Sequence, residues 1–168
     1  MTHLIVNQRG ASLVEIMMAV GIIGVGLWAL SAAIPLSAYG IQEGKQLSTA
    51  TFLANQRLEQ IRSARWEEGP PCLDTLGVSA SDTAAPVGSC TGGTTTFPDE
   101  SALASPYADY ARTVRITDCG VGAGCNGIVA SDLRQVAVTV TYRPMTGIGV
   151  SAAGTAKATT VTMYVARR

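Results

Sequence analysis

The stretch that decides the fold is Arg9-Gly10-Ala11-Ser12-Leu13-Val14-Glu15, which opens an apolar run with no further charge until Glu43. The segment from Ala11 to Ile41 is longer than the roughly 20 residues that a membrane-spanning helix needs. We therefore expect one span. Glu15 is unusual there, because a carboxylate near the bilayer centre costs about 2.5 to 3.5 kcal/mol on insertion.

The helix is expected to continue beyond the apolar run with a different pattern. Apolar residues recur at three- and four-residue spacing at Leu47, Ala50, Ala54, Leu58 and Ile61, whereas Glu43, Lys45, Arg57, Glu59 and Arg62 lie mostly elsewhere. This change indicates an assembly half over residues 11–41 and an amphipathic half over 42–67. We expect one helix from about Ser12 to about Trp66, ended by Gly69-Pro70-Pro71.

Small residues and a proline interrupt the apolar half. Gly21, Gly24 and Gly26 weaken a helix in water but allow neighbouring membrane helices to approach closely. Pro35 removes a hydrogen bond to the Ser31 carbonyl and is expected to kink the helix. The glycines alone do not distinguish ordinary membrane composition from a segment built to pack against copies of itself.

The rest of the chain predicts a loop followed by a sheet. Residues 68–109 are rich in Gly, Pro, Ser, Thr and Ala, and residues 110–168 alternate as strands do. The expected apolar faces consist of Val114 and Ile116; Val136, Val138, Val140 and Tyr142; and Val161, Met163 and Val165. An antiparallel sheet of three to four strands, with one face covered by the amphipathic half of the helix, gives an α+β fold.

All four cysteines, Cys72, Cys90, Cys119 and Cys125, follow the apolar segment. Their spacing lacks the paired C-x2-C pattern of zinc sites, so we expect two disulfides formed in an oxidising compartment. Three pairings are possible, and proximity in the sequence favours Cys72 with Cys90 and Cys119 with Cys125.

The sequence offers little for catalysis. Its one histidine, His3, lies in the first ten residues, which excludes Ser-His-Asp and Cys-His arrangements and the usual zinc hydrolase site from the rest of the chain. Gly120 to Gly124 resembles a phosphate loop but lacks the following lysine, so a hairpin tip closed by a disulfide is expected. Asp118 and Asp132 are interpreted as turn-capping residues rather than calcium ligands. We therefore expect no cofactor and no metal.

The net charge does not point to nucleic acid, because twelve basic residues balance twelve acidic ones. Basic residues are scattered on or beside the expected strands without an interleaved row of aromatic residues, so we interpret them as a solvated face. These residues are Arg112, Arg115, Arg134, Arg143, Lys157, Arg167 and Arg168.

Glu15 has two interpretations. In Ser12-Leu13-Val14-Glu15 it completes a capping box and lies at the favourable end of the helix dipole. Alternatively, cleavage after Gly10 creates a charged amine on Ala11, and this amine on a neighbouring copy neutralises Glu15. Such a pair would set the axial register between subunits.

The polar leader of residues 1–10, the Gly10-Ala11-Ser12-Leu13-Val14-Glu15 motif and the apolar helix after it resemble the processing site of type IV pilins and pseudopilins. Residues 133–142 are similar to the C-terminal part of minor pilins. The resemblance implies a ladle-shaped fold, cleavage after Gly10 by a membrane aspartyl peptidase, methylation at Ala11, and assembly through Glu15.

The resemblance further implies a minor subunit of a type IV pilus, structural rather than enzymatic, which initiates assembly or presents an adhesive surface. Its partners would be the prepilin peptidase, other pilin subunits and an inner-membrane assembly platform. It would cross the inner membrane once, with residues 42–168 in the periplasm, before joining the filament. The alternatives are a pseudopilin of a type II secretion system, a subunit of a DNA-uptake filament, and a secreted binding domain behind a signal peptide cut near Ser31-Ala32-Ala33.

Overall fold

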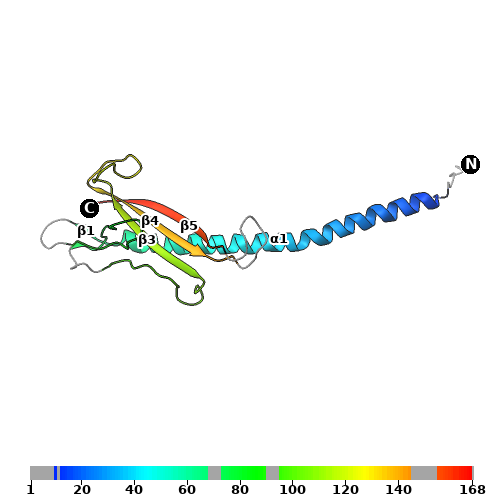
Figure 1. The fold of residues 1–168 in the computed structure, drawn as a ribbon, viewed down its shortest axis with the longest axis horizontal. Helices are drawn as coiled ribbons and strands as arrows, with labels where there is room; N and C mark the ends of the chain where they lie inside the picture. The colour runs from blue at the N-terminus through cyan, green and yellow to red at the C-terminus, as the bar shows by residue number, and fades with distance from the viewer. Residues whose placement is uncertain (1–9, 11, 68–72, 90–94, 145–154, 168) are drawn as a thin grey trace, which may run out of the picture. The chain divides into compact units, whose positions relative to one another are not determined.

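A computed structural model describes residues 10, 12–67, 73–89, 95–144 and 155–167 of the chain (Figure 1). It contains one helix, α1 (Leu13–Arg62), and the strands β1 (Trp66–Glu67), β2 (Leu73–Asp74), β3 (Tyr110–Asp118), β4 (Leu133–Tyr142) and β5 (Lys157–Ala166). The chain divides into two compact units, Met1–Ile41 and Gln42–Arg168.

The first unit contains the apolar part of α1. This part is long and apolar enough to cross a membrane, and its large apolar side chains are exposed. The helix runs through Pro35 without ending there. The expected membrane-length helix near the N-terminus is therefore confirmed, and it is the one such helix in the part of the chain that the structure describes.

The second unit is built on an antiparallel sheet in the order β3-β4-β5. Cross-strand neighbours such as Val114, Val138 and Val161 lie in one row, because the register of both strand pairs is continuous. Burial alternates along each strand, as one covered face requires. The apolar face predicted from the sequence is the face that meets the core.

The amphipathic part of α1 packs on this face and closes the core. Its buried residues are Ala50, Leu53, Ala54, Leu58 and Ile61, which meet Val114, Ile116, Val136, Val138, Val140 and Tyr142. The α+β arrangement of one long helix on a three-stranded antiparallel sheet is confirmed. The expected core residue Leu47 is instead 47% exposed, and Leu53 is buried at 2% exposure.

The helix ends at Arg62, four residues before the position expected from the Gly-Pro-Pro sequence. The Ser63 hydroxyl donates to the Gln60 carbonyl. The Thr75 hydroxyl accepts a hydrogen bond from the Arg65 N–H and donates one to the Arg65 carbonyl. Trp66 is consequently drawn into β1, which pairs with β2 and buries the indole to 4% exposure. Tertiary contacts, rather than a helix-breaking residue, end the helix.

The described part of residues 68–109 carries more structure than a surface loop. It contributes β2, and it covers the outer edge of β3 through Glu100, which exchanges two backbone hydrogen bonds with Arg112. Ser79 also donates its N–H to the Ile116 carbonyl at 2.8 Å. This segment thereby protects one edge of the main sheet.

Candidate functional site

Gly10 and Glu15 lie on either side of Leu13, where α1 begins. The Ser12 carbonyl accepts the N–H groups of Glu15 at 2.9 Å and Ile16 at 3.2 Å, which places Ser12 at the helix cap. Glu15 lies in the first turn with an exposed side chain, where the helix dipole favours a negative charge. Gly10 is exposed, and no atom lies within 4 Å of the point where a Cβ would stand. Ala11, the expected methylation site, lies outside the described residues.

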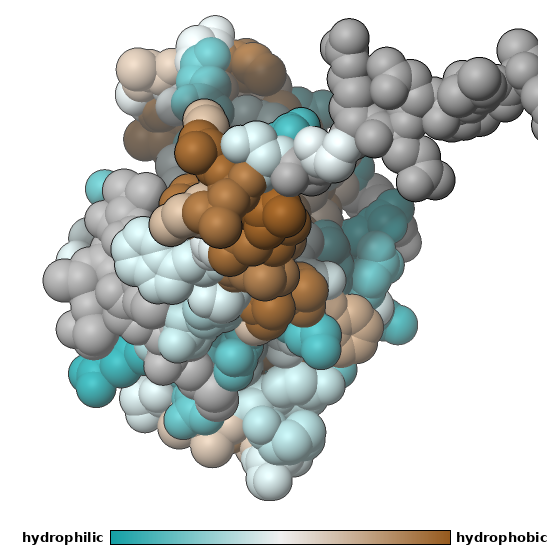
Figure 2. Space-filling view, turned by 90° about the vertical axis from the view of Figure 1, so that its right-hand side faces the viewer, coloured by the Kyte–Doolittle hydropathy of each residue, from teal (hydrophilic) through white to brown (hydrophobic). Residues whose placement is uncertain are grey.

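The helix after Glu15 presents large apolar side chains that nothing in this unit covers. Among them are Met17, Ile22, Leu27, Trp28 and Ile34, each more than 60% exposed. Figure 2 is viewed from the N-terminal end of α1, and the brown side chains at its centre include this apolar segment. At Gly21, Gly24 and Gly26 no atom lies within 4 Å of the Cβ position, so the helix is thin at these three residues. Such a surface favours close helix packing in lipid.

The hairpin between β3 and β4 is closed by a disulfide between Cys119 and Cys125, whose Cα atoms are 4.9 Å apart. This confirms one expected pairing; Cys72 and Cys90 lie outside the described residues. Gly124 adopts a φ of +71°, and a Cβ there would lie 2.1 Å from the Ile128 carbonyl oxygen. Both the positive φ and the lack of room for a Cβ atom therefore require a glycine at position 124.

Of the two aspartates beside this hairpin, Asp118 caps a turn through its carboxylate, and Asp132 is bonded through its backbone carbonyl. The Asp118 carboxylate accepts the Gly120 N–H at 2.8 Å, as expected of a turn cap. The backbone carbonyl of Asp132 accepts the Arg167 N–H at 2.8 Å, and turn capping by the Asp132 carboxylate stays a prediction. Within the described ranges, no group of three or more His, Cys, Asp or Glu side chains is placed to hold a metal ion.

The expectation of a solvated basic face is wrong for Arg112 and Arg134, which are each 6% exposed. Arg112 bonds to the Glu100 carboxylate at 2.7 Å and to the Leu53 carbonyl of α1 at 3.1 Å. Arg57 reaches the same carboxylate at 2.8 Å. Burial and the neighbouring Arg112 lower the pKa of Arg57 despite this contact.

Arg134 forms a second buried pair, with both Asp74 oxygens, at 2.9 and 3.1 Å. Its guanidinium lies 4.2 Å from the centre of the Trp66 ring. Burial tends to raise the pKa of Asp74, but hydrogen bonds from Arg134, Gly77 and Ser89 outweigh it and hold the pKa below its ordinary value. These contacts join β2 and β4 beside Trp66 of β1.

Arg115 is also paired rather than freely solvated. It donates to both oxygens of Asp99 at 2.6 and 2.8 Å and to the carbonyls of Asp82 and Thr83. The Arg115 hydrogen bonds lower the pKa of Asp99, and the same contacts raise the pKa of Arg115. These bonds fasten Asp82, Thr83 and Asp99 to β3.

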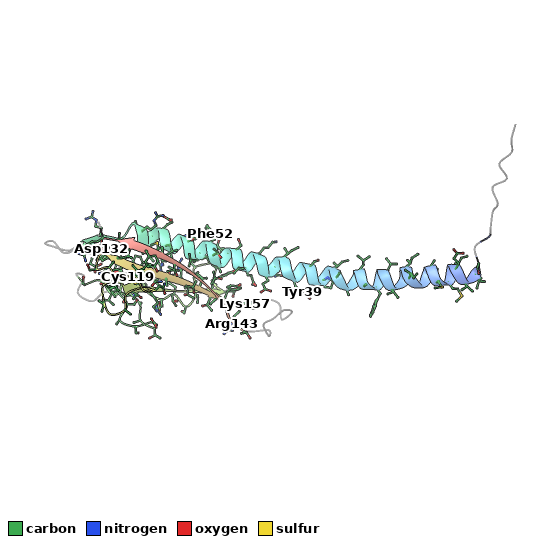
Figure 3. All side chains as sticks on the ribbon, turned by 90° about the horizontal axis from the view of Figure 1, so that it is seen from above. Tyr39, Phe52, Cys119, Asp132, Arg143 and Lys157 are labelled. Carbon is green, nitrogen blue, oxygen red and sulfur yellow. A yellow bond between two sulfur atoms is a disulfide. The ribbon has the colours of Figure 1, made fainter. Side chains whose placement is uncertain are left out.

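The two ends of the main sheet differ in character. Arg143 and Lys157 lie at one end, and Cys119 and Asp132 lie at the other (Figure 3). Lys157 pairs with Glu43 of α1, and Arg143 borders a hollow of about 320 Å³ with Lys45 and three tyrosines, Tyr107, Tyr110 and Tyr142. The sequence does not reveal this aromatic cluster, because Tyr110 and Tyr142 meet only through the β3–β4 register.

Sequence reasoning also missed the buried ion pairs, because Asp74 and Glu100 lie in a segment without strand or helix periodicity. No protein-family model, curated protein or solved structure matches this chain.

Proposed function

We propose that this chain is a structural minor subunit of a type IV pilus or a related filament. The observation that carries the proposal is Glu15, an acidic residue in the first turn of a membrane-length helix whose other side chains up to Ile41 are uncharged. The accessible Gly10 before it suits proteolytic removal of the leader. A catalytic role has no comparable support.

Leader removal and assembly form one mechanism in this proposal. A membrane aspartyl peptidase cuts after Gly10, and the new amine on Ala11 is methylated. In the filament, the amine of one subunit neutralises Glu15 of its neighbour. Leaving one member of such a buried pair without its partner costs about 3 to 5 kcal/mol, so the pair selects the correct axial register.

The exposed apolar helix supplies cohesion in the same proposal. In the membrane its side chains contact lipid, and in the filament they pack against the helices of other subunits. The glycines at positions 21, 24 and 26 allow the close approach that helix association in an apolar medium requires. Before assembly, the chain would remain in the inner membrane with residues 42–168 in the periplasm.

The mature N-terminus tests processing directly. Mass spectrometry of the membrane-extracted protein is expected to find Ala11 as the first residue, methylated. An intact Met1 would contradict the proposal, and a start at Ile34 would indicate an ordinary signal peptide and a secreted domain.

The Glu15→Ala variant tests assembly. It is expected to insert and lose its leader normally but to be depleted from sheared filaments. Glu59→Ala is the matched control, because Glu59 is an exposed carboxylate on the same helix that pairs only with Arg62 at 3.0 Å among the described contacts. Equal incorporation of the two variants would contradict the register role of Glu15.

The alternative filaments are a type II secretion pseudopilus and a DNA-uptake filament. The N-terminal helix would act in the same way in each, so this chain's residues do not separate them. The identities of co-purifying subunits decide between these machines.

A further inference from the structure

The hollow beside Arg143 has no role in the proposed function. It measures about 320 Å³, which is within the range of about 300 to 1,000 Å³ for ligand pockets. It lies where β3 begins at Tyr110 and β4 ends at Tyr142, at the end of the sheet where Arg143 is labelled in Figure 3. Its walls are α1 on one side and, on the other, this end of the sheet with the turn before β3.

The helix wall of the hollow lies just beyond the apolar segment. Its residues are spaced by three and four positions, which places them on one side of α1. They are Gln42, Lys45, Gln46 and Thr49. Lys45 follows Ile41 by four residues, which is about 6 Å in a helix, and the headgroup layer extends about 5 to 8 Å beyond the hydrocarbon core. Lys45 is therefore at headgroup level when residues 11–41 span a bilayer.

The opposite wall is aromatic. Tyr107 and Tyr110 meet edge to face with ring centres 6.3 Å apart, and the rings of Tyr110 and Tyr142 lie 5.8 Å apart. Burial and the neighbouring Tyr110 raise the pKa of Tyr142, so its hydroxyl stays protonated at neutral pH and is able to donate a hydrogen bond. Tyrosines are enriched at membrane surfaces, because the ring is apolar and the hydroxyl is polar.

The charged residues of the hollow leave one excess positive charge. They are Lys45, Arg143 and Asp109, two cations and one carboxylate, with a formal sum of +1. Among the described residues, neither the Lys45 ammonium nor the Arg143 guanidinium has a hydrogen-bond or ion-pair partner. The nearby Glu43 carboxylate is taken up by Lys157. The hollow therefore fits a ligand with one negative charge.

The depth and the charge together indicate a phospholipid headgroup. The phosphodiester of an anionic phospholipid lies at headgroup level and carries one negative charge. Arginine and lysine both bind phosphate oxygens through charge-assisted hydrogen bonds. In phosphatidylglycerol, the glycerol hydroxyls would also offer donors to the Asp109 carboxylate. A zwitterionic headgroup has no net charge and would leave the excess positive charge in place.

We propose that this hollow binds the headgroup phosphate of an anionic phospholipid. Lys45 and Arg143 neutralise the phosphate, and the Tyr142 hydroxyl donates to it. Basic pockets beside membrane helices bind lipid headgroups in this way. The bound lipid ties residues 42–168 to the membrane surface before assembly. The inference rests on the membrane span of the proposed function, but not on leader cleavage or on the pairing of Glu15.

The test uses the full chain in nanodiscs that contain equal amounts of phosphatidylglycerol and phosphatidylcholine. Native mass spectrometry of the released protein is expected to find phosphatidylglycerol retained at least about tenfold more than phosphatidylcholine, a preference of about 1.4 kcal/mol. In a second set of discs, phosphatidylethanolamine replaces phosphatidylcholine, and the same preference is expected. Equal retention of the two lipids in either set would overturn the proposal.

A double variant tests the residues. Lys45→Gln combined with Arg143→Gln is expected to reduce the preference to less than about twofold. Both positions are exposed, so the fold tolerates these changes. Arg65→Gln is the matched control, because Arg65 is an exposed arginine that follows the C-terminal end of α1 and does not line this hollow. A double variant that keeps the tenfold preference would overturn the proposal.

A soluble phosphate compound is the other source of the same chemistry. Glycerol 3-phosphate titrated into the full chain in detergent is expected to give no saturable shift of the Arg143 side-chain NMR signals below millimolar concentration. Saturation at micromolar concentration would assign the hollow to a soluble ligand and overturn the lipid assignment. A chain that fails to enter nanodiscs would contradict the membrane span and the proposed function as well, whereas entry without lipid selection would contradict this proposal alone.

Discussion

Asp74 and Arg134, sixty positions apart in the chain, form a bidentate ion pair that is almost completely buried, with side chains 5% and 8% exposed. The pair ties β2 to β4 beside Trp66. Replacing Asp74 with Asn would leave the Arg134 charge buried without a counter-charge, which typically costs about 3 to 5 kcal/mol. We expect a loss of this size in the free energy of unfolding, measured by urea denaturation in detergent. A loss below about 1 kcal/mol would show that water reaches Arg134.

Stability is expected to fall in acid. Asp74 and Asp99 both have a pKa lowered from the ordinary value of 3.8. Each carboxylate therefore contributes stability that is fully present above about pH 4 to 5 and is lost as the pH falls through the lower pKa of the folded state. Thermal melts from pH 6 to pH 2 should show this loss as a falling melting temperature. In the Asp74→Asn variant the melting temperature should fall less steeply with pH. An unchanged slope in that variant would assign the acid sensitivity to other groups.

The Cys119–Cys125 disulfide closes a short loop, so its contribution is moderate. Loop-closure entropy for a ring of this size gives about 2 kcal/mol. A double substitution of both cysteines by alanine should lower the melting temperature by several degrees while preserving the β3–β4 pairing, measured by circular dichroism. Loss of the strand signal would mean that the disulfide is needed to form the hairpin.

Two glycines in the same hairpin provide a matched pair of variants. Both Gly122 and Gly124 have positive φ, but only Gly124 has atoms close to the Cβ position, with the Ile128 carbonyl oxygen at 2.1 Å. Gly122→Ala should cost about 1 to 2 kcal/mol from the backbone conformation alone. Gly124→Ala should cost distinctly more, and equal unfolding free energies for the two variants would contradict the steric argument.

The two faces of α1 in the second unit should respond differently to truncation. Leu58 is 5% exposed in the core, whereas Phe52 is 59% exposed on the face turned away from the sheet (Figure 3). Leu58→Ala is expected to cost about 2 to 5 kcal/mol of unfolding free energy. Phe52→Ala should stay within about 0.5 kcal/mol in the isolated chain. A large effect of Phe52→Ala in denaturation would indicate contacts beyond those described.

Local pattern was sufficient to predict several elements. Alternation at Val136, Val138 and Val140 has the period of a strand with one covered face, and the uncharged run after Glu15 has the length of a spanning helix. Both signals arise within a few consecutive residues, because strand and helix geometry determine which neighbours share a face. The Cys119–Cys125 disulfide was predictable because the two cysteines are only six positions apart in the sequence.

Tertiary structure alone decided the features that depend on distant partners. Arg112 and Arg134 look like surface residues in the sequence, and only the folded chain brings Glu100 and Asp74 within hydrogen-bonding distance of them. The helix ends at Arg62 because Arg65 bonds to Thr75 and β1 pairs with β2. No helix-breaking residue marks this position in the sequence. The sequence by itself determined the apolar helix and the strands, because both follow from neighbours along the chain; packing determined where the helix stops and which charges are buried, because these depend on distant partners.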